Sequence, residues 1–399
     1  MVVIFSNAGK MKIRIFLLLF FLFLLPAFVL PLETVSALEY VHFRHRGKER
    51  NEEGRIILEE SAGIALETRD SRLYVISPRN LISRRSDDVP FTAYTKAEMI
   101  ERLRVEFPPD EKYGYLDTHD PFIVVYTTEQ PFANWCGNLL KKLYEQYTLH
   151  WKRLGVELAA PEFPLVAVVL SSEERYRQFA EQDGVTLSPE QCAYYHKLTN
   201  RIVMYDMSGQ QVFREGNRRR TTAADIQRFL TQPGSYNNIM AVIHEAAHQV
   251  GYNTGMHPRH APNPVWICEG LAIFHEVPDP KNRQIGWTLG PHVNRYRLEQ
   301  LRRYLGKPNL ESPIQQMIQN DSLFRKPDTA FDNYALAWGV TYYLFKRRPK
   351  ELTAYLKILQ EKTSESDDSD EIRIKDFESC FGENWNAFYR DFFDFLRRL

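Results

Sequence analysis

The stretch His244-Glu245-Ala246-Ala247-His248 decides how this chain of 399 residues is interpreted. Two histidines four residues apart lie on the same face of a helix, because one helical turn takes 3.6 residues. Their ring nitrogens can therefore bind one metal ion, with the carboxylate of Glu245 beside it. The surrounding segment 237–250 is mostly apolar, and an unpaired imidazole is costly to bury. The pattern favours a metal-binding helix over two hydrogen-bonded core histidines.

Two layouts compete to supply a third ligand. In the first layout a histidine on a tight turn follows the motif, but this chain has Thr254 at that position. A threonine hydroxyl is a poor replacement for imidazole on zinc. His257 and His260 lie further along, at a spacing that does not fit the turn. The second layout takes a glutamate from a following helix.

Glu269 fits the second layout. It lies in the apolar segment 266–272, where a lone carboxylate is hard to explain as solvated surface. Asn263, followed by a proline, signals that a helix begins just before this segment. Gly270 is expected to let this helix pack closely against the histidine helix. Glu269 is therefore preferred as the third ligand over Glu276 or a histidine in a loop.

The combined pattern resembles a known class of enzymes. H-E-x-x-H followed about twenty residues later by W-x-x-E-G-x-A is similar to the pattern of the glutamate-zincins, metallopeptidases of the peptidase MA-like clan. This resemblance covers roughly residues 122–347. Segments 160–170 and 200–206, together with the apolar N-terminus, resemble a narrower group, the secreted bacterial family called domain of unknown function 1570.

The clan resemblance implies a zinc ion (Zn2+) and specific residue roles. Three side chains would be the zinc ligands: His244, His248 and Glu269. Glu245 would be the general base that takes a proton from the metal-activated water and returns it to the leaving amine. The clan usually adds a tyrosine or histidine that donates to the developing oxyanion, and Tyr334 is our candidate. Packing against Trp338, one turn later, is the alternative role for Tyr334.

The chain departs from the clan pattern at one position. Some members place an aspartate four residues after the glutamate ligand, where it orients the first histidine. This chain has Ile273 there, so the orienting group must come from elsewhere, with Glu276 and Asn238 as candidates. The resemblance therefore supports metal binding more directly than catalysis.

Composition limits the class of protein. Hydrophobic residues make up 44% of the chain and charged residues 26%, as in folded soluble proteins. Lysine plus arginine equals aspartate plus glutamate at 51 each, so no basic field attracts nucleic acid. The four cysteines are compatible with two disulfides, and none forms a C-x-x-C pair, which argues against an all-cysteine zinc site.

The N-terminus has the layout of a secretory signal over residues 1–37. Basic residues precede the apolar run 15–32, and Val35-Ser36-Ala37 offers small residues for cleavage. The run also approaches the length of a membrane-spanning helix, so an uncleaved anchor is the alternative, and it would be the only membrane contact. In both cases the remaining chain is expected to be secreted or in the cell envelope.

The rest of the chain is expected to form an α+β fold in three parts. Residues 38–85 contain short strands separated by glycine-containing turns, which predict a small β-rich module. Residues 95–255 alternate strands and helices and end with the histidine helix, as in a zincin-like α/β subdomain. Residues 256–399 are mainly helical and carry the third ligand. In the clan, a strand bordering the cleft holds extended peptide by edge pairing, and Arg201–Tyr205 is expected to be that strand.

These patterns predict a secreted zinc metallopeptidase acting on a peptide or protein substrate. The alternative is a non-catalytic zincin-fold protein that binds a partner in the cell envelope. The presence of Glu245 argues against it, because a structural metal site needs no base. A zinc hydrolase acting on another kind of bond is a third interpretation. Neither the substrate nor the oligomeric state follows from the sequence.

Overall fold

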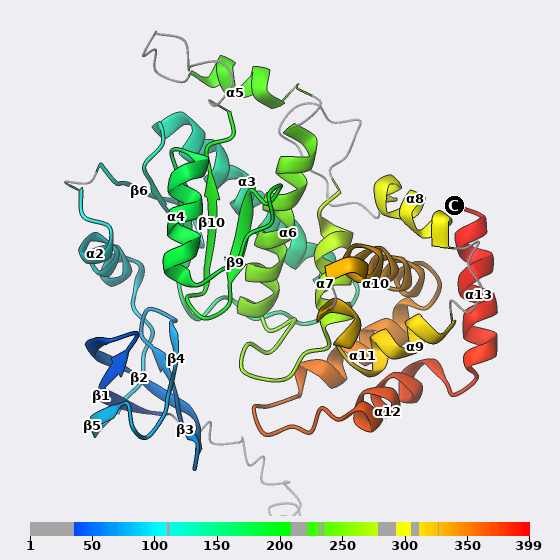
Figure 1. Cartoon of the computed structure of the whole chain (residues 1–399), viewed down its shortest axis with the longest axis horizontal. Coiled ribbons are helices and arrows are strands. Elements are labelled where there is room, and N and C mark those ends of the chain that lie inside the picture. Colours follow the sequence, from blue (N-terminus) through cyan, green and yellow to red (C-terminus); the bar gives the residue numbers. More distant parts are fainter. Residues whose placement is uncertain are drawn as a thin grey trace, which may run out of the picture.

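A computed structural model describes residues 36–109, 112–208, 222–230, 232, 235–277, 293–304, 311–325 and 327–399. Apart from its last two residues, the predicted signal segment 1–37 lies outside these ranges. No helix of the described residues is long and apolar enough to cross a membrane. The fold class is α+β, as predicted: a small sheet is followed by a mixed sheet with helices and then by a helical region (Figure 1).

The N-terminal module is a five-stranded antiparallel sheet with the order β4-β3-β2-β1-β5. Its strands are β1 (Ala37–His45), β2 (Lys48–Glu60), β3 (Gly63–Thr68), β4 (Leu73–Ile76) and β5 (Leu81–Pro90). Alternate residues such as Val41 and Phe43 on β1 are buried in one small core. This alternation is typical of an antiparallel sheet with one covered face. The last strand extends past residue 85, where the sequence places the end of the module.

The second sheet has the strand order β6-β7-β8-β10-β9. Its strands are β6 (Gly114–His119), β7 (Phe122–Tyr126), β8 (Leu165–Leu170), β9 (Ala193–His196) and β10 (Arg201–Tyr205). β8 is parallel to both of its neighbours, and all of its side chains are buried. An unbroken apolar run is what a strand needs when helices cover both faces of its sheet.

Helices cover the second sheet on both sides. α3 (Gln130–Arg153) and α6 (Ser235–Asn253) share the main core with one face of the sheet. α2 (Lys96–Glu106) and α4 (Glu173–Asp183) share a separate core with the other face. The short helix α5 (Ala223–Leu230) precedes α6. The histidine motif therefore lies on a helix that is packed against a rigid sheet.

Among the described strands, β6 and β9 form the two edges of this sheet, and β9 is the edge next to β10. β10 pairs with parallel β8 on one side and with antiparallel β9 on the other. The prediction that Arg201–Tyr205 borders the cleft is therefore wrong. β9 comes just before β10 in the chain and pairs with it, so β9 covers the side of β10 that was expected to be free.

The C-terminal region is helical and centres on α10. Its elements are α7 (Val265–His275), α8 (Arg295–Tyr304), α9 (Glu311–Gln319), η2 (Ser322–Arg325), α10 (Pro327–Arg347), α11 (Pro349–Gln360), α12 (Asp370–Phe381) and α13 (Trp385–Arg397). α10 contacts α7, α8, α11 and α13. Aromatic side chains such as Trp338 and Phe392 fill the space between them.

Gly270 permits a close helix contact, but with a different helix from the one expected. A Cβ atom at Gly270 would lie 2.9 Å from the backbone oxygen of Ala337 and would collide with Thr341. Both residues belong to α10, so the close approach is between α7 and α10. α7 also contacts α6. α7 thus lies between the histidine helix and the C-terminal helices.

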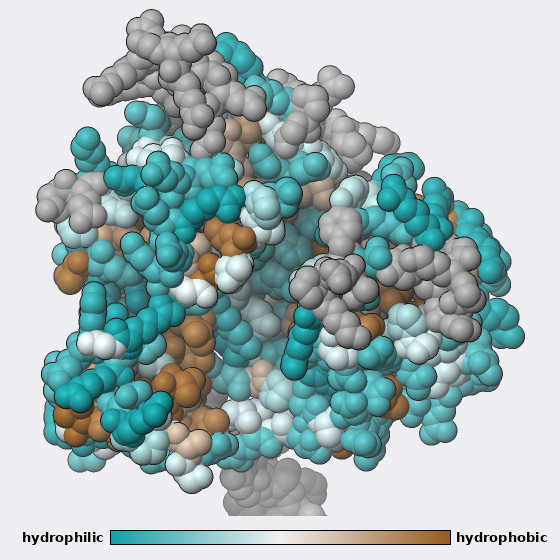
Figure 2. Space-filling view, viewed as in Figure 1, coloured by the Kyte–Doolittle hydropathy of each residue, from teal (hydrophilic) through white to brown (hydrophobic). Residues whose placement is uncertain are grey.

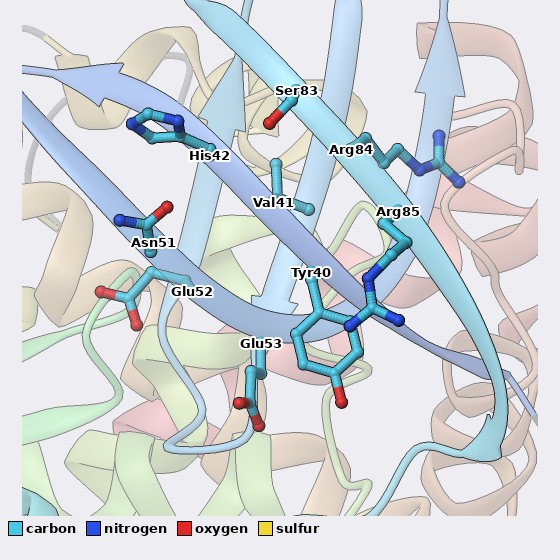
Figure 3. A pocket seen from close by; sticks show the side chains of 9 residues that line it. All are labelled: Tyr40, Val41, His42, Asn51, Glu52, Glu53, Ser83, Arg84 and Arg85. Carbon is cyan, nitrogen blue, oxygen red and sulfur yellow. The ribbon is translucent and has the colours of Figure 1, made fainter.

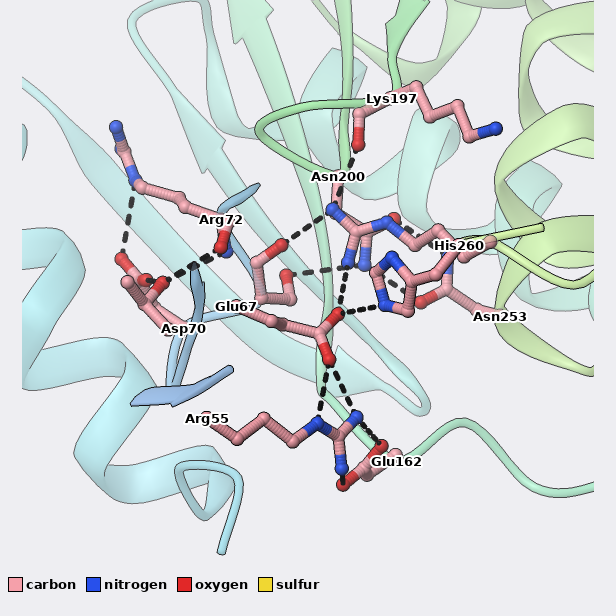
Figure 4. Close-up of polar contacts among 12 residues, drawn as sticks. Arg55, Glu67, Asp70, Arg72, Glu162, Lys197, Asn200, Asn253 and His260 are labelled. Carbon is pink, nitrogen blue, oxygen red and sulfur yellow. Dashed lines mark hydrogen bonds and ion pairs between the residues drawn. The ribbon is translucent and has the colours of Figure 1, made fainter. Parts of the chain in front are cut away.

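Glu67 joins the β module to the segment between α6 and α7 (Figure 4). Its side chain is only 1% exposed, and it accepts hydrogen bonds from Arg55 at 2.9 Å, Arg259 at 3.0 Å and His260 at 2.8 Å. Burial alone would raise the pKa of Glu67, but His260 and the two arginines outweigh burial and lower it. The ionised carboxylate thus fixes the connection between α6 and α7 to the module.

Candidate metal centre

α6 presents the two histidines of the motif away from the sheet. Its apolar residues, including Ile243, Ala246 and Val250, are buried in the main core. His244 and His248 lie one turn apart, with ring centroids 4.8 Å from each other. Their side chains are only 15% and 12% exposed. The helical period therefore produces the paired imidazoles that the sequence predicts.

α7 brings Glu269 to these two rings. The Nε2 atom of His244 lies 3.2 Å from Oε2 of Glu269 and 3.2 Å from Nε2 of His248. The third separation, between Nε2 of His248 and Oε2 of Glu269, is 3.4 Å. In a tetrahedral zinc site with bonds of about 2.0–2.1 Å, neighbouring ligand atoms are about 3.3–3.4 Å apart. These three atoms therefore have the spacing that a single zinc ion requires.

A second carboxylate orients the first histidine. Oε2 of Glu276 lies 3.0 Å from Nδ1 of His244, and the other oxygen of Glu276 accepts a hydrogen bond of 2.8 Å from Asn294. Of the two candidates for this role, the structure places Glu276 against the ring. An Nδ1–H donor to Glu276 leaves the Nε2 lone pair directed at the metal position. Ile273, at the position of the clan aspartate, is fully buried in the core.

The oppositely charged side chains of the cluster stabilise one another in their charged forms. Burial would lower the pKa of His244, but hydrogen bonds and charge from Glu269 and Glu276 raise it well above its usual value. Burial would raise the pKa of Glu269, but the charge of His248 and hydrogen bonds from both histidines lower it. Without a metal, a protonated histidine thus bridges two carboxylates. A metal ion bound to these side chains would take the place of that proton.

Glu245 lies in the same cavity as the three ligand atoms. Its carboxylate accepts a hydrogen bond of 2.8 Å from the backbone N–H of Tyr195 on the edge strand β9. Burial raises the pKa of Glu245, and the charges of the two motif histidines oppose this rise. A carboxylate with a raised pKa is a better proton acceptor than an ordinary one. The edge strand thus holds a basic carboxylate beside the cluster.

Tyr334, from α10, also lines this cavity of about 260 Å³. Its ring makes an edge contact with Phe324 at 5.7 Å, whereas Trp338 stacks on Tyr342. The charge of Glu269, together with burial and the charge of Glu245, raises the pKa of Tyr334. Its hydroxyl therefore stays protonated at neutral pH and remains able to donate a hydrogen bond.

The sequence analysis missed several other residues that line the cavity. Tyr252 lies one turn after His248 on α6, so the helical period could have identified it. Tyr195 and Lys197 come from β9 and its end, and no local signal directs them to this site. The surface is hollowed between the sheet and the helical region (Figure 2). The cavity thus lies between elements that are distant in sequence.

Two nearby histidines and the four cysteines lie outside the ligand cluster. His257 packs on Tyr252 with ring centroids 5.5 Å apart, and His260 is bound to Glu67, so neither joins the cluster. All four cysteines, Cys136, Cys192, Cys268 and Cys380, are free. The two disulfides that the composition allows are therefore not formed. Burial raises the pKa of Cys268 to about 12, so this cavity-lining thiol is not ionised at neutral pH.

A separate pocket of about 430 Å³ lies on the β module (Figure 3). Its charged groups already have partners within the fold. Arg84 binds Glu39 and Glu59, and Arg85 lies over the ring of Tyr40 at 4.1 Å. Glu52 binds Arg102. This pocket therefore lacks the free chemical groups that distinguish the cavity beside the histidines.

A comparison with protein families gives a match that covers the helices carrying the clustered histidines and glutamate. No curated protein matches the chain. The matching segment runs from α6 into the region after α11 and contains the three ligand residues, Glu276 and Tyr334, but neither Tyr195 nor Lys197. Residues 238–365 match the family described as "Protein of unknown function (DUF1570)", in agreement with the narrower resemblance drawn from the sequence.

Proposed function

We propose that this protein is a zinc-dependent metallopeptidase that hydrolyses peptide bonds in a peptide or protein substrate. The spacing of 3.2–3.4 Å among the ligand atoms of His244, His248 and Glu269 carries the proposal. Three protein ligands leave one coordination position open, as in catalytic zinc sites. Zinc bound there would lower the pKa of water towards neutrality and polarise the substrate carbonyl. The resemblance to the glutamate-zincins supports the same conclusion.

Glu245 is the general base in this proposal. The N–H of Tyr195 binds one of its carboxylate oxygens, at 2.8 Å, and thereby limits the orientation of the group. The other oxygen can accept a proton from the attacking water. The same group can then return the proton to the leaving amine. A raised pKa favours both steps, because it strengthens the base and still permits release of the proton.

Tyr334 is the proposed donor to the developing oxyanion. It enters the cavity from α10, while the zinc ligands come from α6 and α7. A protonated hydroxyl in a largely buried site stabilises negative charge more effectively than one in water. We also propose that the protein is secreted or in the cell envelope, because basic residues and an apolar run precede Val35-Ser36-Ala37.

The test uses the chain from Ser36 onward, with zinc content measured by mass spectrometry and cleavage measured on a mixed peptide library. We expect about one zinc per chain. Glu245→Gln is expected to keep the zinc and to lower the cleavage rate by about 10²–10⁴-fold. Glu181→Gln, an exposed position on α4, is the matched control and should cleave normally. Zinc without cleavage by either protein would favour the non-catalytic alternative, and absence of zinc would contradict the metal centre.

Glu276→Gln is expected to weaken zinc binding by about 10–100-fold, the usual cost of losing a carboxylate that orients a metal-binding histidine. The amide keeps the size of the side chain and can still accept from Asn294, but it removes the negative charge beside Nδ1 of His244. Competition with a chelator of known affinity measures the change. Unaltered zinc affinity would show that Glu276 does not orient the histidine.

A further inference from the structure

The candidate catalytic cavity contains the ammonium group of a lysine that has no role in the proposed hydrolysis. Lys197 follows β9 and lines the cavity together with Glu245 and Glu269. Its Nζ atom lies 4.7 Å from the ring centroid of Tyr252. Within the described part of the chain, no carboxylate forms an ion pair with this ammonium group. Figure 4 shows its amino group extending away from the charge network around Glu67, while its backbone oxygen accepts from Arg259.

Two other partly buried cations in this fold have carboxylate partners. Arg259 binds Glu67, and Lys362 binds Asp368 at 3.4 Å. Lys197, by contrast, has only the face of an aromatic ring, which attracts a cation less strongly than a carboxylate does. Burial lowers the pKa of Lys197, and no protein carboxylate compensates for the lost hydration. The cavity therefore contains a partly desolvated cation available to a ligand.

The position of Lys197 relates it to the metal centre. Tyr252, beneath the ammonium group, lies four residues after His248 on α6. Four residues of helix correspond to about 6 Å along its axis. A group bound by Lys197 would therefore lie about one helical turn from the zinc ligands, within reach of the residues that flank a scissile bond.

We propose that Lys197 binds a carboxylate of the substrate, so that this peptidase selects peptides with a negative charge close to the cleaved bond. The inference rests on the proposed function and adds the substrate class. The ammonium group of Lys197 carries one positive charge in this cavity, and no carboxylate of the described residues forms an ion pair with it. One substrate carboxylate neutralises that charge. It comes either from an aspartate or glutamate side chain or from the C-terminus of the peptide.

Binding to the zinc-loaded, full-length Glu245→Gln protein tests this inference without requiring cleavage. The probes are four fluorescent peptide libraries with a fixed central glutamate or glutamine, each with a free or an amidated C-terminus. Lys197→Met is expected to weaken binding of the carboxylate-bearing libraries by about 10–100-fold, the usual range for a hydrogen bond to a charged group. Binding of the neutral library should not change. Methionine keeps the apolar contact with Tyr252, so the fold is expected to be retained.

Two controls accompany the test. Lys197→Arg keeps the charge and should retain most of the carboxylate preference. Lys152→Met, at an exposed position on α3, should have no effect. If Lys197→Met weakens binding only of the libraries with a central glutamate, Lys197 binds a side-chain carboxylate. If it weakens binding only of the libraries with a free C-terminus, Lys197 binds the C-terminal carboxylate. In active protein, Lys197→Met should raise KM for acidic peptides much more than KM for neutral peptides.

The outcomes separate this inference from the proposed function. Zinc content should be the same in the wild type and in Lys197→Met, because Lys197 is not a ligand. Carboxylate-dependent binding that requires Lys197, in a protein that cleaves nothing, would support the carboxylate site and contradict the peptidase. Cleavage with no carboxylate preference, or with a preference that survives Lys197→Met, would overturn the inference while the peptidase stands.

Discussion

Glu269→Ala is expected to remove most of the bound zinc and all measurable peptide cleavage. The carboxylate of Glu269 lies 3.2 Å from His244 and 3.4 Å from His248, so it supplies the third corner of the ligand set. Zinc binding free energies of about 10–16 kcal/mol in four-ligand sites correspond to about 3 kcal/mol or more per ligand. Loss of one ligand should therefore weaken zinc binding by at least about 10²-fold.

Zinc titration monitored by chelator competition measures this effect, and the peptide library measures the activity. Glu245→Gln is the matched control, because Glu245 shares the cavity but is not among the three clustered ligands. The control should lose activity and keep zinc, whereas Glu269→Ala should lose both. Full zinc affinity in Glu269→Ala would exclude this ligand set, and Glu276 would then be the next carboxylate to test.

Local periodicity accounts for the part of the site that the sequence predicts well. His244 and His248 face the same way because they are separated by about one helical turn. Asn263 and the following proline indicated a second helix, and the structure has α7 there, but its N-cap is Pro264 and no side chain caps it. The side chain of Asn263 donates instead to the backbone oxygens of Pro258 and Ala261. The tertiary fold then brings Glu269 to the histidines. The α+β class likewise follows from where strand and helix patterns occur along the chain.

Contacts between distant segments account for what the sequence could not show. One edge of the second sheet is β9 rather than β10, because Ala193–His196 pairs with β10 from the side opposite β8. Gly270 packs against Ala337 and Thr341 of α10, which come more than 60 positions later in the chain. Both outcomes depend on which surfaces meet after folding, and hydropathy patterns carry no information about that choice.

The site residues that were missed have the same explanation. Tyr195 contributes its backbone N–H, a group present in every residue except proline, so residue type gives no signal. Lys197 resembles any solvated lysine until Tyr252 and the cavity are seen beside it. Cys136, Cys192, Cys268 and Cys380 had the even number that permits disulfides, yet the fold leaves all of them free.

Glu67→Ala is expected to lower the free energy of unfolding by about 3–5 kcal/mol, the range for removal of one partner from a buried ion pair. Arg259 is 8% exposed and would lose its carboxylate partner. Glu162→Ala is the matched control, because Glu162 binds the same Arg55 but is 48% exposed. Its expected cost is below about 1 kcal/mol. Urea unfolding at neutral pH measures both, and equal effects in the two variants would contradict the argument.

The pH dependence of the stability lost on replacing Glu67 tests whether that loss is electrostatic in origin. The folded protein holds the pKa of Glu67 below its ordinary value of 4.5, mainly because His260 and the arginines outweigh burial. The carboxylate therefore contributes stability above pH 4.5, and that contribution is lost as the pH falls through the lowered pKa of the folded state. The difference in unfolding free energy between the wild type and Glu67→Gln should shrink in acid, as the pH falls through this lowered pKa. A difference that stays constant into acid would mean that the shape of the side chain, rather than its charge, fixes the segment between α6 and α7 to the β module.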